Sequence, residues 1–379
     1  MPRSRSRKTK DQGGRLDLPF AEGARLGLNA VPDLLLDGKG AGGLCGRGEG
    51  LLARHDRAST LPSRKEGKGM HRLNLELPGK GAGDWLDGYA AALKALAAQM
   101  DLGGAAPKAG NVALVGYLMD RNEGDHLGNV RELERMLAAL GLKAVSVWLS
   151  GRPYESLAEA RHAAAVVSLP HGREAGRVLA KRLGVKLVEA ELPFGLDRTR
   201  RFMERLGKEF GKQKEAADFI KQELDEIVPR LEWSVPHAFL NRRFAFAGDP
   251  HYGPAFAELI AELGGVMAGM LLTAGPHHLA KAQREALEKS QTAWFEPEAK
   301  AVRKRWNDKF WSGVDLLVAT TQLLEIVKPA TGWLEMGYPS YLTHAPLEDP
   351  FLGFQGCLGF LSKAATETAK GFCLKAGAA

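Results

Sequence analysis

With 379 residues, the chain exceeds the usual size of a single hydrophobic core, so we expect two or more domains. Hydrophobic residues at 45% and charged residues at 26% are typical of a globular protein, and three scattered cysteines exclude a disulfide framework. The net charge is +7, but five positive charges lie in MPRSRSRKTK at the N-terminus, which favours a solvated leader over a nucleic-acid-binding face. Without a signal-like apolar segment or a run of about 18 apolar residues, a cytoplasmic protein with no membrane span is predicted.

Residues 1–80 form a basic, glycine-rich region in which no helix or strand period is sustained. The segment GKGAGG at 38–43 matches GxGxxG, and Asp56 follows at the distance of a ribose-binding acid. No helix is predicted directly behind it, and such a pattern arises readily by chance among so many glycines. We therefore expect a poorly patterned N-terminal region rather than a nucleotide site.

Residues 81–210 read as a first Rossmann-like domain. GDWLDGYAAALKALAAQM has apolar residues at helical spacing and predicts the first helix. Short β-rich runs then alternate with amphipathic helices. Strands are expected at 111–119, 143–150, 164–170 and 185–192, and helices at 130–142, 154–163 and 172–184. This alternation predicts parallel strands joined by right-handed crossovers.

A charged helical region at 199–231, stopped near Pro229, predicts a helical linker at 211–238, and the pattern then repeats in a second domain at 239–379. Strands are expected at 242–248, 266–275, 292–297, 315–320 and 332–342, and helices at 253–265, 278–290, 301–311, 321–330 and from 351 onward. The predicted fold is α/β, with tandem Rossmann-like, doubly wound parallel-sheet domains behind the N-terminal region.

Polar residues recur where the predicted strands end. They are Asp125 and His126 in DRNEGDH, His171, Asp249, His251, His277, His278 and His344. Any one of them alone is better explained as a loop residue, and DRNEGDH would also suit a turn before a helix capped by Asn129. Because open α/β sheets bind ligands at the carboxyl ends of their strands, the repetition predicts a site in a cleft between the domains.

Several segments in order resemble nitrogenase component 1-type oxidoreductases, a family that includes nitrogenase, its cofactor-assembly scaffolds and dark-operative protochlorophyllide reductase. They are VALVGYLMDRN with GNVRELERMLAALGL, then ELPFGLDRTRRFMERLGKEFG, and RRFAFAGDPHYGPAFAELIAELGG. The ending GYPSYLTH with PFLGFQGCLGFL is similar to the family's G-x-P-x-x-x-x-H and P-x-x-G-[FY]-x-G pattern. The resemblance covers about residues 80–379 and leaves a shortened N-terminal domain.

The resemblance implies a subunit paired with a homologous partner or with itself, and an ATP-dependent iron-sulfur reductase as electron donor. His344 falls where the family's catalytic subunit has a histidine ligand to its metal cluster. The alternative is that His344 packs against Tyr341 and Phe351. Only Cys45 lies where the family has N-terminal cysteine ligands, so it is either one ligand of an iron-sulfur cluster shared with a partner or part of a relative that has lost the cluster.

We therefore expect an oxidoreductase subunit in electron transfer or in metallocofactor assembly. Cys45 and His344 are the predicted cofactor and metal ligands. Asp125, His126 and His171 are the predicted catalytic residues that position substrate or donate protons. Two alternatives remain: a non-redox two-domain binding module for a tetrapyrrole or metal ligand, and a nonfunctional remnant.

Overall fold

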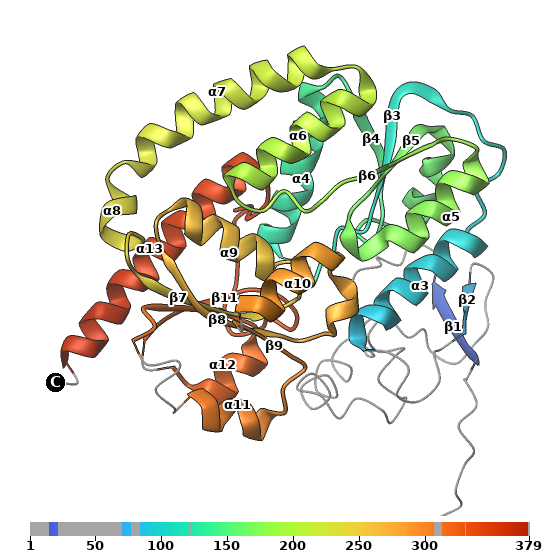
Figure 1. The fold of residues 1–379 in the computed structure, drawn as a ribbon. Coiled ribbons are helices and arrows are strands. Elements are labelled where there is room, and N and C mark those ends of the chain that lie inside the picture. The colour runs from blue at the N-terminus through green and yellow to red at the C-terminus, as the bar shows by residue number, and fades with distance from the viewer. Residues whose placement is uncertain are drawn as a thin grey trace, which may run out of the picture.

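The computed structural model describes residues 15–21, 70–76, 84–121, 123–290, 292–306, 313–329 and 331–377. Two parallel sheets, each covered by helices, make up most of it (Figure 1). This confirms the predicted α/β class with two Rossmann-like sheets. No helix in the described ranges is long and apolar enough to cross a membrane. Cys45 lies outside the described residues.

The first sheet has the strand order β4-β3-β5-β6, and every neighbouring pair is parallel. Its strands are β3 (Lys108–Val115), β4 (Lys143–Val147), β5 (Ala163–Ser168) and β6 (Lys186–Glu189). Its helices are α3 (Trp85–Gln99), α4 (Gly124–Ala139) and α5 (Arg173–Leu183). Alternate β3 side chains face opposite layers: Val112 and Leu114 share a core with α4, whereas Ala113 and Val115 share one with α3 and α5.

The second sheet has the order β11-β10-β7-β8-β9, also entirely parallel. Its strands are β7 (Arg243–Gly248), β8 (Val266–Leu272), β9 (Ala293–Phe295), β10 (Leu316–Ala319) and β11 (Gly332–Glu335). Its helices are α9 (Gly253–Glu262), α10 (Lys281–Ser290), α11 (Ala299–Trp306) and α12 (Thr321–Val327). In each sheet the chain first adds strands on one side of its first strand and then continues on the other side. The topological switch points therefore lie between β3 and β5 and between β7 and β10.

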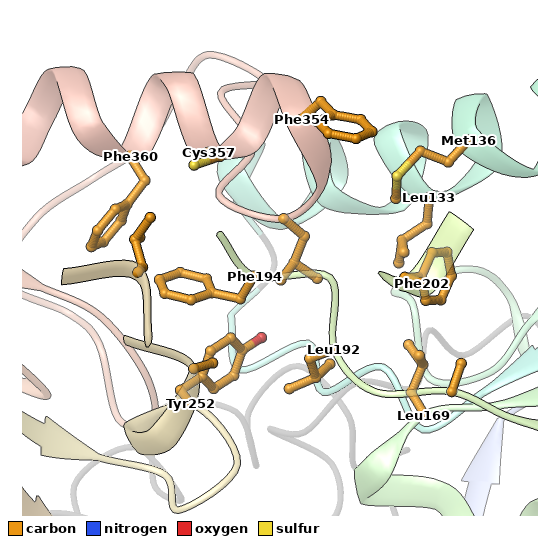
Figure 2. Close-up of a cluster of buried hydrophobic side chains, with 14 of the residues drawn as sticks. Leu133, Met136, Leu169, Leu192, Phe194, Phe202, Tyr252, Phe354, Cys357 and Phe360 are labelled. Carbon is orange, nitrogen blue, oxygen red and sulfur yellow. The ribbon is translucent and has the colours of Figure 1, made fainter. Parts of the chain in front are cut away.

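The two sheets share one hydrophobic core. Three helices connect the sheets in the chain: α6 (Leu196–Phe210), α7 (Gln213–Leu231) and α8 (Ser234–Ala238). The last helix, α13 (Gly353–Gly377), follows β11 and returns to pack on α4, α6 and α7 (Figure 1). Figure 2 shows Phe194 between Tyr252 of the second unit and Phe360 of α13, with ring centroids 5.5 and 5.1 Å apart. This shared core fixes one sheet relative to the other.

The structure refines several local predictions. The helix predicted at 154–163 is a 3-10 helix over Tyr154–His162, and the helical region predicted at 199–231 consists of two helices, separated where Gly211 takes a left-handed conformation. Pro229 lies inside α7, which ends close to it at Leu231, as predicted. The last strand ends at Glu335, because the chain after it turns into a loop whose amides bond to that residue's own carboxylate.

Two further differences concern helix and strand positions. Helix α4 begins at Gly124, so Asn129 lies inside it and is not its N-cap. Strands β1 (Arg15–Ala21) and β2 (Met70–Glu76) form an antiparallel pair in the region where the sequence predicts no strand.

Candidate functional site between the two sheets

The carboxyl ends of β5 and β7, in different sheets, lie against each other. His171 lies in the 3-10 turn Pro170–Gly172 after β5, and Asp249 follows β7 directly. His171 Nε2 is 2.5 Å from Asp249 Oδ2, and both side chains are almost completely buried. The inter-domain cleft expected from the strand-end residues therefore contains a direct contact between the two units.

A glycine contact lets His171 reach this position. Gly116, after β3, has φ of +87°, and a Cβ there would lie 2.3 Å from the backbone nitrogen of Gly172. The loops after β3 and β5 thus cross in backbone-to-backbone contact at the switch point of the first sheet. Only glycine fits such an approach, and it places His171 one residue before the crossing.

The His171 imidazole has one anchored and one unpartnered nitrogen. Asp249 holds Nε2, while Nδ1 has no hydrogen-bond partner among the residues that the structure describes. His251 lies beside it, with ring centroids 4.7 Å apart, and its backbone amide donates to Asp249 Oδ1 over 2.8 Å. One nitrogen or oxygen of each of the three side chains lies within 4.8 Å of the others, a spacing that suits a shared ligand.

The surroundings set the charge of this group. Burial opposes ionisation of Asp249, but the adjacent His171 and the amide of His251 outweigh it and hold the pKa of Asp249 to about 2. Burial, together with the adjacent His171, lowers the pKa of His251 to about 3. Near neutral pH the site therefore combines an ionised carboxylate with a neutral imidazole at His251.

His126 belongs to a second buried polar group. Asn129 Nδ2 donates to the Tyr117 hydroxyl over 2.9 Å, so that hydroxyl donates to His126 Nδ1 over 2.7 Å, and His126 Nε2 contacts the Asp120 carboxylate. Both ring nitrogens of His126 are thus engaged, in contrast to His171. Rings connect the two groups: His126–Phe351, Phe351–Tyr252 and Tyr252–His171 have centroids 5.2, 6.2 and 6.3 Å apart.

Asp125 and His344 lie at a more open cavity of about 330 Å³. Its polar lining includes Asp120, Arg121, Asp125, His126, Glu335 and His344. Arg121 Nη2 donates to Asp125 over 2.6 Å, and despite burial the pKa of Asp125 is lowered by His126 and Arg121. The structure thus brings the predicted residues Asp125, His126 and His344 to one cavity, with His171 in the neighbouring group.

The His344 side chain is 77% exposed, and its Nδ1 is 2.9 Å from Glu123 Oε1. The loop that carries it is fixed by Glu335, whose buried carboxylate accepts the amides of Leu342 and Thr343 at 3.0 and 2.6 Å. Arg121 Nη1 also donates to the Thr343 carbonyl oxygen over 2.6 Å. Glu335 was not predicted as a site residue, because the loop whose amides it accepts was predicted to be part of a strand.

The donor atoms available in this site are imidazoles and carboxylates. Of the cysteines that the structure describes, Cys357 is buried in the core, where burial raises its pKa, and Cys373 is exposed on α13. Neither lines the cavity or the His171 group. An iron-sulfur cluster is held by thiolates, so the described part of the site does not fit one.

Comparisons with known proteins agree with this architecture. The family described as nitrogenase component 1 type oxidoreductase matches residues 63–368. The nitrogenase molybdenum-iron protein beta chain of Bradyrhizobium sp. (strain ANU 289) is 25% identical over 263 residues, which cover 64% of this chain and 50% of that protein. This chain thus spans about half the length of that relative.

Two solved structures share the fold. "Nitrogenase Cp1 at pH 6.5" has a TM-score of 0.62 at 17% identity, covering 76% of this chain and 66% of its own. "Nitrogenase Cp1 at pH 5" has a TM-score of 0.58 at 14% identity, covering 78% and 64%. From the family match over most of its length, we conclude that the chain belongs to the nitrogenase component 1-type oxidoreductase family.

Proposed function

We propose that this protein is a nitrogenase component 1-like subunit that handles a metal-containing cofactor between its two sheets. The observation that carries the proposal is the buried His171, with Nε2 anchored by Asp249 and Nδ1 unpartnered beside His251. A carboxylate on one ring nitrogen orients a metal-binding histidine and raises the basicity of the other nitrogen.

This arrangement leaves the lone pair of a neutral His171 on Nδ1, because Nε2–H donates to Asp249. The lowered pKa of His251 keeps its imidazole neutral, so a metal would meet imidazole nitrogens of His251 and His171 beside one carboxylate. Such a donor set suits iron and other first-row transition metals. When bound, the metal-containing group would supply the redox or Lewis-acid chemistry, and the protein residues would hold it and exclude water.

The adjacent cavity suits substrate positioning and proton supply. Its volume of about 330 Å³ is at the lower end of the range for small-molecule sites, roughly 300–1,000 Å³. His126 is linked through Tyr117 to Asn129, and exposed His344 lies at the cavity wall. Histidines can exchange protons near neutral pH, so we assign His126, His344 and the charge of Asp125 to substrate positioning and proton transfer.

A homologous second subunit or a second copy of this chain is the proposed partner, and an ATP-dependent iron-sulfur reductase is the proposed electron donor. The family and the beta-chain relative support this assignment. An iron-sulfur cluster in the assembly would need thiolates from the partner, with Cys45 as the one contribution proposed from this chain.

A second candidate function is a non-redox binding module for a tetrapyrrole or metal ligand. The thiolate-free, imidazole-rich donor set of the described site favours it specifically. The two functions differ in whether the bound group changes oxidation state when a reductase is supplied.

The test is anaerobic purification of the full chain, followed by iron and sulfide analysis and a visible spectrum. His171→Ala and Cys45→Ala are compared with His237→Ala, which alters an exposed histidine on α8. Loss of iron in His171→Ala alone supports a cofactor held between the sheets, and reduction of its spectrum by reductase and ATP selects the redox function.

Other outcomes separate the remaining cases. Matched iron and sulfide that disappear in Cys45→Ala would assign the metal to a shared cluster. Iron unaffected by His171→Ala, or no iron in any preparation reconstituted with partner and cofactor, would refute cofactor handling at this site.

A further inference from the structure

A second group of histidines and aspartates joins the two units a short distance from His171. Asp84 and Asp87 lie at the start of α3, and His277 and His278 lie in the 3-10 turn Pro276–His278 after β8. These pairs are about 190 positions apart in the chain, yet their donor atoms all lie within 4.8 Å of one another. The four residues are called the α3–β8 cluster below.

We propose that the α3–β8 cluster binds one divalent metal ion of the zinc type, with one ligand atom from each residue, and thereby ties α3 to the second sheet. In a tetrahedral zinc site with bonds of about 2.1 Å, neighbouring ligand atoms are about 3.4 Å apart. His278 Nε2 is 2.9 Å from Asp84 Oδ2 and 3.8 Å from Asp87 Oδ1. His277 Nε2 is 3.1 Å from Asp87 Oδ1 and 3.9 Å from Asp84 Oδ2. The four separations bracket the tetrahedral edge.

The hydrogen bonds of the two carboxylates leave the required lone pairs available. Asp84 Oδ1 caps α3 by accepting the amides of Leu86 and Asp87, whereas Oδ2 accepts one of the described backbone amides, that of Gly275, at 2.7 Å. Asp87 Oδ2 accepts the Asp84 amide, and its Oδ1 accepts none of the described backbone amides. The helix cap therefore orients the carboxylates, and both oxygens of each lie near a histidine: His278 Nε2 is 2.9 Å from each oxygen of Asp84, and His277 Nε2 is 3.1 and 3.0 Å from Asp87 Oδ1 and Oδ2. Asp84 Oδ2 and Asp87 Oδ1 have the fewer amide bonds, so we assign them as the ligand atoms, and the outer hydrogen bonds orient them.

Gly275 provides the room for His277. A Cβ at this position would lie 2.6 Å from His277 Nδ1 and 3.4 Å from Asp84 Oδ2. The backbone there has an ordinary φ of −69°, so space rather than conformation explains the glycine. The absence of a side chain lets the imidazole approach the Gly275 backbone while its Nε2 contacts the aspartates.

Charge balance favours a metal over a purely ionic clamp. The His277 and His278 ring centroids are only 4.1 Å apart, so neutralising both carboxylates with two imidazolium ions would place like charges in contact. A single divalent cation neutralises the same two carboxylates and takes both imidazoles as neutral ligands. His278 also lies 6.0 Å, ring to ring, from His251, so the bound ion would lie next to the His171 group without sharing a ligand with it.

The test uses the full chain, stripped of metal by chelation and then titrated with zinc. We expect one equivalent bound per chain at this site, a rise in the unfolding temperature on zinc addition, and visible bands of tetrahedral geometry with cobalt(II). His277→Ala is the main variant, since its side chain is 55% exposed and we expect the fold to tolerate its removal. It should weaken zinc binding at least about tenfold and abolish most of the zinc-dependent rise in unfolding temperature.

Three comparisons make the result decisive. His237→Ala should bind zinc like the unaltered chain. His171→Ala should retain the zinc equivalent that His277→Ala loses, which separates this site from the proposed cofactor site. Gly275→Ala should weaken binding by displacing His277. The proposal is overturned if zinc affinity is unchanged in His277→Ala, or if His277→Ala lowers the unfolding temperature equally with and without zinc, since that result describes an ionic clamp alone.

Discussion

His171 and Asp249 belong to different sheets, yet their side chains meet at 2.5 Å in the interior of the protein. They are 78 positions apart in the chain and follow the strands β5 and β7. The contact places the proposed cofactor site at the carboxyl ends of both sheets at once. It depends on the crossing of the loops after β3 and β5 and on the shared core, whereas the loop after β11 lines the neighbouring cavity. Each of these three features can be perturbed separately.

Gly116→Ala tests the loop crossing. An added Cβ would meet the backbone of Gly172, so we expect the free energy of unfolding to fall by about 3 kcal/mol or more. Gly184→Ala is the matched control, because Gly184 also has positive φ but has nothing within 4 Å of the added atom. It should cost about 1–2 kcal/mol in urea unfolding. Equal losses in the two variants would contradict the importance of the crossing.

Glu335→Gln tests the hydrogen bonds that hold the loop carrying His344. A glutamine cannot present acceptors to all of the amides at Tyr341, Leu342 and Thr343, so we expect a loss of about 3 kcal/mol. Hydrogen exchange of these three amides should accelerate more than that of the rest of the second unit. Glu288→Gln, in an exposed position on α10, should leave their exchange unchanged.

Phe194→Ala tests the core that joins the units (Figure 2). The ring is fully buried against Tyr252 and Phe360, so its removal should lower the free energy of unfolding by about 3–5 kcal/mol. Because the lost contacts link the two sheets, we also expect a less cooperative denaturant transition. Phe372→Ala is the control, because Phe372 is 37% exposed and its ring contacts Arg242. It should lower the free energy of unfolding by no more than about 1 kcal/mol.

Glu223→Gln tests the ionic contact between α4, α7 and α13. Arg135 donates to Glu223 over 2.6 Å, and Gln355 donates to it over 3.1 Å. Burial opposes ionisation, but these donors lower the pKa of Glu223 below its ordinary value. The resulting stability is therefore present above the unfolded-state pKa and is lost as the pH falls through the lower folded-state pKa.

The variant should be less stable than the unaltered chain by about 1–2 kcal/mol near pH 7, as measured by urea unfolding. The difference should shrink steadily on acidification from about pH 5 downward, where the carboxyl group of the unaltered chain becomes protonated. A difference that stays constant across this range would show that packing, rather than charge, explains the contribution of Glu223. Glu226→Gln, on the exposed side of α7, supplies the control.

The sequence by itself determined the alternation of strands and helices, the parallel sheets and the placement of histidines at strand ends. These follow from apolar periodicity and from breakers such as Gly141 and Gly184, which act over a few residues. The same local reading failed where a longer-range contact overrides it: the loop after Glu335 is held by a carboxylate rather than by a strand partner.

Only the tertiary structure decided which of these polar residues meet. The angle between the two sheets is set by the shared core around Phe194 and by α13 returning onto the first unit, and no local periodicity encodes that angle. It brings His171 to Asp249, and Asp84 to His278, and it leaves His344 exposed beside Glu123. Side chains that share a position in the strand pattern thus acquire different environments, because burial and partners depend on how whole sheets pack.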